Sequence, residues 1–131
     1  MPIEAKDLSR LADAQAAQAG NEAGRRSAIS RAYYAAYHRC RRWELMLPHR
    51  GRAKLPGGVH DRLIQRLDTP DRRCCDALAE RSRALAKLLK QELDCRVAAD
   101  YHLWKSIDEE AVREQLDATR QVFAKCAAPD T

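Results

Sequence analysis

Apolar residues recur at intervals of three and four along most of the chain, the spacing that places them on one face of an α-helix. The longest such stripe follows Asn21 and continues for about five turns. Its members are Ile29, Ala32, Tyr33, Ala36, Tyr37, Cys40, Trp43 and Leu47. Similar stripes predict helices over residues 3–19, over residues 59–67, after Asp71 and after Ser106. Since no segment alternates as a strand would, the pattern predicts an all-α, up-and-down bundle of four long helices and one short helix.

The expected helix ends follow from capping and helix-breaking residues. Asn21 and Asp71 are predicted N-caps, because their side chains can accept a hydrogen bond from a backbone amide of the first turn. The S-x-x-E run at residues 106–109 is a predicted capping box that opens the last helix, and Pro129 is expected to end the ordered part of the chain. The prolines and glycines of residues 48–58 exclude a regular helix, so this segment is expected to be an exposed, mobile loop.

The length of 131 residues predicts one domain, residues 1–131, because chains of this size seldom hold two cores. No apolar run approaches the roughly 20 residues of a membrane span. The five cysteines form an odd set without CxxC spacing and follow no apolar leader, so a reducing cytoplasm is the expected compartment. The sequence shows no metal-ligand cluster and no glycine-rich phosphate loop, and we expect neither a metal nor a cofactor.

The net charge of +5 is concentrated in one segment. Residues 25–54 hold nine basic residues and a single acid, Glu44, which gives a local charge of +8. Such an excess is typical either of a solvated helix face or of a surface that meets a polyanion such as RNA. Arg50, Arg52 and Lys54 are the candidate nucleic-acid-binding residues of the predicted loop, since they can contact a phosphate backbone. A basic loop is equally well explained by solubility.

The aromatic residues of the longest stripe also allow two interpretations. Tyr33, Tyr34 and Tyr37 can stack on bases, but tyrosines at helical spacing more often fill a core, and we expect the core role. His38 lies next to the stripe and is either a boundary residue bonded to a neighbouring helix or a supporting residue of a functional site. His60, in the short helix, is expected on the surface.

Arg96 and His102 are the residues best suited to chemistry. Cleavage of RNA without a metal needs a base of near-neutral pKa for the 2′-hydroxyl proton and a fixed cation for the charge on the phosphate oxygens. His102 suits the first role and Arg96 the second. Residues six apart on a straight helix point about 120° apart, at roughly 100° per residue. Convergence therefore requires a break in the helix at residues 98–101, or a second subunit that brings its own pair to the same place.

Two neighbours are candidate supporting residues. Asp100, four residues after Arg96, forms either a simple intrahelical ion pair or a support that orients the guanidinium. Tyr101 places a hydroxyl nearby. His102 itself has a structural alternative, as a residue at a helix boundary satisfied by a backbone carbonyl.

Two stretches of the chain resemble the HEPN family of small helical-bundle proteins. One is the run R-S-A-I-S-R-A-Y-Y-A-A-Y-H at residues 26–38, which in that family lies on a long early helix. The other is Arg96 followed by His102, with five residues between them, because an arginine followed after a few residues by a histidine marks the family's ribonuclease members. The expected helix order is similar to that of the family along nearly the whole chain.

The resemblance implies a metal-independent endoribonuclease that leaves a 2′,3′-cyclic phosphate, with Arg96 and His102 as its catalytic residues and RNA as its substrate. It also implies a homodimer, or a pair with another HEPN chain, that brings two Arg/His pairs into one cleft. Many such proteins are toxins of toxin–antitoxin or phage-defence systems, and the implied partner is then a nucleotidyltransferase-like antitoxin.

Two positions depart from the family's pattern. Many active members carry a polar residue directly after the arginine, where this chain has Val97, and some carry a tyrosine two residues after the histidine, where it has Trp104. Two alternatives to a ribonuclease therefore stay open. One is a non-catalytic HEPN module for dimerisation or for nucleic-acid or partner binding, and the other is a regulator or assembly adaptor that binds a neighbouring protein.

Overall fold

The computed structural model describes residues 2–128, which form five helices and no strand. The helices are α1 (Ala5–Gln18), α2 (Glu22–Leu45), α3 (Val59–Asp68), α4 (Asp76–Tyr101) and α5 (Glu109–Ala127). The predicted all-α class is confirmed, as are the four longer helices and the short one. Pro129, the expected end of the ordered chain, lies outside the described residues. No helix within residues 2–128 is both long and apolar enough to cross a membrane.

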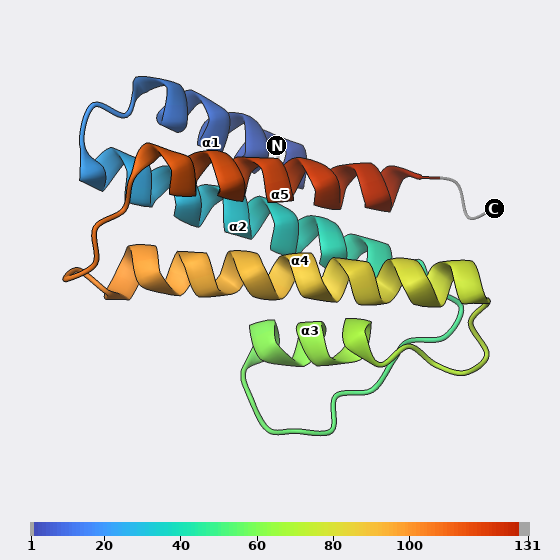
Figure 1. Ribbon diagram of the computed structural model, residues 1–131. Helices are drawn as coiled ribbons and strands as arrows, with labels where there is room; N and C mark the ends of the chain where they lie inside the picture. Colours follow the sequence, from blue (N-terminus) through green and yellow to red (C-terminus); the bar gives the residue numbers. More distant parts are fainter. Residues whose placement is uncertain (1, 129–131) are drawn as a thin grey trace.

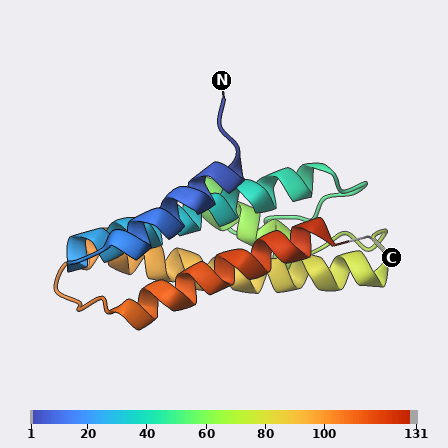
Figure 2. The same cartoon turned by 90° about the horizontal axis from the view of Figure 1, so that it is seen from above.

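The four longer helices alternate in direction along the chain and form the bundle (Figure 1). α2 occupies its centre, because α1, α4 and α5 all pack against it. α3 lies along the outside of α4, below the bundle in Figure 1. In the perpendicular view α4 and α5 lie side by side, and α1 runs along the first part of α2 (Figure 2).

The buried face of α2 combines small and large side chains. Ala28, Ala32, Ala35 and Ala36 are fully buried, and their small size lets neighbouring helices approach the α2 backbone closely. The main core joins residues of α2, α3, α4 and α5: Tyr33, Cys40, Trp43, Leu63, Leu67, Leu85, Leu89, Leu93 and Val122. Each fully buried leucine contributes about 1.5–3 kcal/mol. The predicted core role of the tyrosine stripe is confirmed.

The predicted cap of α2 is confirmed, whereas that of α4 is wrong. The side-chain oxygen of Asn21 accepts a hydrogen bond from the backbone N–H of Gly24 at 2.8 Å. Asp71 does not cap α4, which begins only at Asp76. Its carboxylate instead accepts from the backbone N–H of Arg73 at 2.8 Å and from the Arg73 guanidinium at 2.9 Å. This local turn satisfies Asp71 before the helix starts.

The predicted capping box of α5 is also wrong. Asp108 caps this helix, and its carboxylate accepts from a first-turn N–H at 2.9 Å. Ile107, the residue before it, is buried, and its N–H donates to the carboxylate of Glu22 at 2.5 Å. Because this tertiary contact holds the chain outside the helix at Ile107, the helix starts too late for Ser106 to cap it.

The loop between α2 and α3 forms no helix, as predicted, but contacts with α3 set its path. At Gly51 an added Cβ would lie 2.0 Å from the carbonyl oxygen of Arg66 and 2.3 Å from that of Thr69, so the close approach requires glycine. Beside it, the N–H of Arg52 donates to the Thr69 carbonyl at 3.3 Å. The N–H of Leu55 donates to a glutamine side chain of α3 at 2.9 Å. The loop is thus anchored to α3 at two points.

Two carboxylates are buried in the bundle, and they are satisfied differently. Glu44 of α2 accepts from the guanidinium groups of Arg41 at 2.6 Å and of Arg66 at 2.7 Å. Glu92 of α4 is fully buried, and its Oε1 accepts from the Thr119 hydroxyl at 2.5 Å. Within the described chain, no cation pairs with Glu92 and its Oε2 has no hydrogen-bond partner. Burial raises the pKa of Glu92 to about 8, so this side chain is mostly neutral at pH 7.

Candidate functional site

Arg96 lies in the last two turns of α4, where side chains of α2 and α4 hold its guanidinium in place. Nε donates to Oδ2 of Asp100 at 2.8 Å, and Nη2 donates to the Tyr34 hydroxyl at 2.9 Å. The guanidinium carbon also lies 5.2 Å from the ring centre of Tyr34 and 5.5 Å from that of Tyr101. These hydrogen bonds and cation–π contacts hold the guanidinium in one orientation. The Arg96 side chain is 15 % exposed, so neighbouring residues surround most of it.

The pairing of Arg96 with Asp100 confirms the ion pair expected from their spacing of four. The structure adds an interhelical contact, because the hydroxyl of Ser30 on α2 donates to Oδ2 of Asp100 at 3.3 Å. Asp100 therefore receives bonds from two helices and acts as a support for the guanidinium. Tyr101, the other predicted supporting residue, is 63 % exposed and covers one face of the cation.

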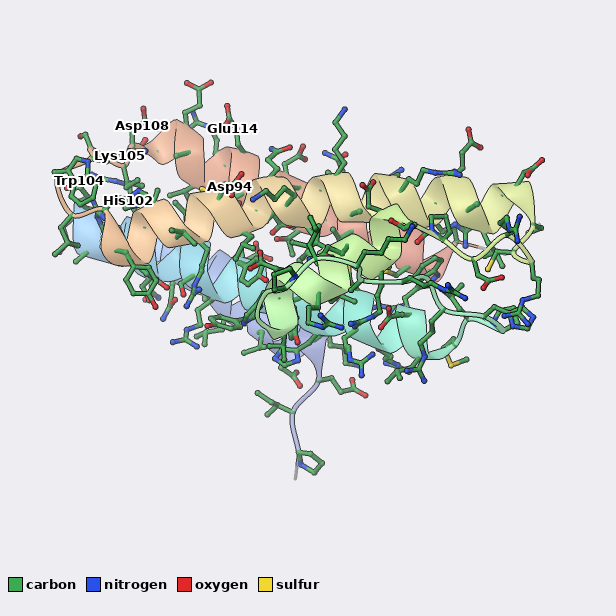
Figure 3. All side chains as sticks on the ribbon, turned by 90° about the horizontal axis from the view of Figure 1, so that it is seen from below. Asp94, His102, Trp104, Lys105, Asp108 and Glu114 are labelled. Atoms are coloured by element: carbon green, nitrogen blue, oxygen red, sulfur yellow. The ribbon has the colours of Figure 1, made fainter. Side chains whose placement is uncertain are left out.

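His102 does not meet Arg96 within one chain. α4 continues without a break through residues 98–101, so the helix break considered as one route to convergence is not found. His102 is the C-cap residue, just past the end of α4, and its ring stacks on Trp104 at a centroid distance of 4.8 Å. Figure 3 shows His102, Trp104 and Lys105 together at that end of the molecule. No contact joins the Arg96 and His102 side chains anywhere in residues 2–128.

Arg26 holds this end of α4 in place, a role that the sequence did not reveal. Its guanidinium donates to the carbonyl oxygens of Ala98 at 3.2 Å, Ala99 at 2.9 Å and His102 at 3.3 Å, and also to that of Lys105. The last carbonyls of a helix lack partners within it and carry partial negative charge, so an arginine from α2 stabilises them. Arg26 belongs to the tyrosine-rich run, and this contact gives one structural reason for its place there.

His60 is the residue that sequence reasoning placed wrongly. It is half-buried in the first turn of α3, and Nδ1 lies 2.7 Å from the hydroxyl of Tyr33. Its ring centre lies 4.5 Å from that of Tyr37 and 6.0 Å from that of Tyr34. Because Tyr34 also contacts Arg96, one tyrosine bridges the guanidinium and this imidazole. The sequence did not predict this position of His60, because α3 contacts the tyrosines of α2 only through tertiary packing.

Electrostatics keep His60 and Tyr33 uncharged at neutral pH. Burial, and then the charge of Arg96, lower the pKa of His60 below its usual value. Burial raises the pKa of the Tyr33 hydroxyl, which therefore keeps its proton. When Tyr33 donates this proton to Nδ1 of His60, the proton of the neutral imidazole is on Nε2. We call Tyr34, His60, Arg96, Asp100 and Tyr101 the Arg96 cluster.

The remaining predicted site residues lie outside this cluster. His38 is exposed, and its ring centre lies 5.2 Å from that of Tyr37. Arg52 and Lys54 line a groove at the opposite end of α3 from His60, together with the turn that precedes α4. Arg50 is exposed and does not line it. The loop cations and the Arg96 cluster are thus two separate sites.

No group of three or more His, Cys, Asp or Glu side chains in residues 2–128 is arranged to hold a metal ion. No protein-family model, curated protein or solved structure compared with the chain matches it. The resemblance to HEPN proteins therefore rests on the two stretches quoted above and stays a prediction.

Proposed function

We propose that the protein is an endoribonuclease that needs no metal and binds the scissile phosphate at the Arg96 cluster. A histidine takes the proton of the 2′-hydroxyl, and the 2′-oxygen attacks phosphorus. The bond from phosphorus to the 5′-oxygen breaks, and that oxygen leaves with a proton as a 5′-hydroxyl. The other product ends in a 2′,3′-cyclic phosphate. Arg96 stabilises the negative charge on the phosphate oxygens.

The observation that carries the proposal is the fixed orientation of Arg96. Asp100 and Tyr34 occupy Nε and Nη2, whereas Nη1 donates no hydrogen bond to any residue between 2 and 128. A guanidinium held in this way has donors left for phosphate oxygens and loses little conformational freedom when they arrive. The neighbouring ring of Tyr101, which is exposed to solvent, offers a stacking surface for an unpaired base.

Two histidines are candidates for the base. His102 is the one that the HEPN resemblance implies, and since it makes no contact with Arg96 of its own chain, it would act on the phosphate bound by a second subunit. His60 lies in the same chain, beside Tyr34, and its lowered pKa keeps it neutral at pH 7. It can accept a proton at Nε2 in the other tautomer, in which Nδ1–H donates to the Tyr33 hydroxyl oxygen. The first requires a homodimer, whereas the second does not.

Mixing two inactive variants separates these possibilities. Single-stranded RNA is incubated with the protein in excess chelator, and products are tested for 2′,3′-cyclic phosphate. Arg96→Ala and His102→Ala are expected to be inactive alone but to regain activity when mixed, because each heterodimer contains one complete Arg96/His102 site. Arg96→Ala mixed with His60→Ala regains nothing if His60 acts within its own chain.

The matched controls are Arg83→Ala, an exposed arginine of the same helix, and His49→Ala. Both are expected to cleave like the wild type, and thermal unfolding checks that every variant is folded. Wild-type protein that leaves single-stranded RNA intact at every pH from 5 to 9 would refute the proposal.

A second candidate, a binding module without catalysis, is favoured by large exposed apolar side chains at the end of α4 and in the link that follows it. Tyr101 is 63 % exposed, Leu103 75 % and Trp104 76 %. Monomeric proteins rarely leave several large apolar side chains together in solvent, so a second copy of the chain is the proposed occupant. In a toxin–antitoxin pair, a nucleotidyltransferase-like antitoxin would cover these side chains in place of the second copy. Light scattering of Trp104→Ser against wild type tests it, and a wild-type monomer at high concentration would exclude the homodimer.

A further inference from the structure

A basic groove lies at the end of α3 that is remote from His60. It has a volume of about 430 Å³, and two segments on either side of α3 in the chain supply its lining: Arg52, Lys54, Thr69, Pro70, Asp71, Arg72 and Arg73. The loop between α2 and α3 forms one wall, and the turn between α3 and α4 forms the other. Four of the lining side chains are cationic, and one is acidic.

The single carboxylate of the groove is already neutralised. Asp71 accepts from the backbone N–H, Nε and Nη2 of Arg73 at 2.8, 2.9 and 3.2 Å. These bonds lower the pKa of Asp71, which therefore stays ionised and bound to Arg73. Arg52, Lys54 and Arg72 form no ion pair with any residue that the structure describes. Four positive charges and one negative charge leave the groove with a net charge of +3.

The two walls are held together before any ligand arrives. The backbone at Gly51 packs against the carbonyl oxygens of Arg66 and Thr69, at distances that a Cβ would not allow. The N–H of Arg52 donates to the Thr69 carbonyl at 3.3 Å, which joins the loop to the turn. Pro70 restricts the backbone of the second wall. The exposed cations that line this preformed groove repel one another, and an anion bound between them relieves this repulsion.

We propose that this groove binds linked phosphate groups, as in a nucleoside diphosphate or triphosphate or in inorganic polyphosphate. A terminal phosphate carries a charge of about −1.5 to −2 at pH 7 and each linking phosphate about −1, so a diphosphate nearly matches the groove's charge. One phosphodiester of a nucleic-acid strand carries a charge of about −1, so it would balance only a third of the groove's net charge of +3. Arginine forks bind two phosphate oxygens at once. No lining residue is aromatic, so the phosphate chain and not a base is recognised.

Isothermal titration at low salt tests the proposal with four probes: orthophosphate, tripolyphosphate, a nucleoside triphosphate and a 5′-hydroxyl single-stranded RNA. Tripolyphosphate and the nucleoside triphosphate are expected to bind similarly and much more tightly than orthophosphate. A clear preference for tripolyphosphate identifies free polyphosphate as the source, and one for the nucleoside triphosphate identifies a nucleotide. Binding is expected to weaken as salt is added, because the groove is open to solvent.

The variant Arg52→Gln/Arg72→Gln removes two cations without breaking an ion pair, and it is expected to weaken tripolyphosphate binding roughly tenfold or more. Arg83→Gln/Lys87→Gln removes the same charge from the exposed face of α4 and is the matched control. Equal weakening in both variants would overturn the proposal, as would RNA binding at the groove without binding of tripolyphosphate. Cleavage by the Arg96 cluster is a separate measurement and does not affect this outcome.

Discussion

Replacing Glu92 by glutamine is expected to make the protein more stable at neutral and alkaline pH. The carboxyl of Glu92 is fully buried, accepts a single side-chain hydrogen bond, from Thr119, and has no cationic partner within residues 2–128. Burial raises its pKa from the usual 4.5 to about 8. Glutamine has the same shape and keeps an oxygen for the Thr119 hydroxyl, but it cannot ionise.

The magnitude follows from the difference in proton binding between the two states. Below pH 4.5 both states are protonated, and the stabilising contribution of the raised pKa is fully present. Between pH 4.5 and pH 8 the unfolded chain releases the proton, whereas the folded protein keeps it. Each pH unit in that window lowers the free energy of unfolding by roughly 1 kcal/mol, so the step from pH 5 to pH 7 costs roughly 2–3 kcal/mol.

Urea unfolding of wild type and Glu92→Gln at pH 5, 6, 7 and 8 measures this cost. The stability difference in favour of the variant is expected to grow with pH, by roughly 2–3 kcal/mol between pH 5 and pH 7. Glu80→Gln, on the exposed face of the same helix, is the control and is expected to show no such trend. A difference between wild type and Glu92→Gln that stays constant across the series would refute the reasoning.

Three further predictions concern stability: urea unfolding measures the first two, and amide hydrogen exchange measures the third. Glu44→Gln is expected to cost about 1.5–3 kcal/mol, because it removes the buried charge that pairs with the partly exposed Arg41 and Arg66; an unchanged stability would contradict this. Gly51→Ala is expected to cost more than 1 kcal/mol, since its Cβ would meet two backbone carbonyls, whereas Gly58→Ala, with open space around it, is the control. Arg26→Ala is expected to destabilise the end of α4, seen as faster amide exchange at residues 98–105 than in wild type; unchanged exchange would show that these carbonyls do not depend on the guanidinium.

The sequence predicted only part of the candidate site. The spacing of four between Arg96 and Asp100 was enough to predict their pair, because neighbours on one helix turn meet whatever surrounds them. The spacing of six between Arg96 and His102 was not enough to predict where the two side chains lie. α4 ends between the two residues, and the ring of His102 stacks on Trp104. The position of His60 beside Tyr33 has no local signature, since it depends on where α3 lies along the bundle.

Local patterns also account for the helices themselves. The apolar period of three to four and the cap at Asn21 act over a few residues, so they specify each helix and where α2 begins. Contacts between distant residues decided the rest. Ile107 docks on Glu22 and delays α5, and Gly51 packs on the end of α3, which brings Arg52 beside the turn of Arg72. Such contacts form only when the helices pack, and so the chain specifies its helices locally while the packed bundle creates both sites.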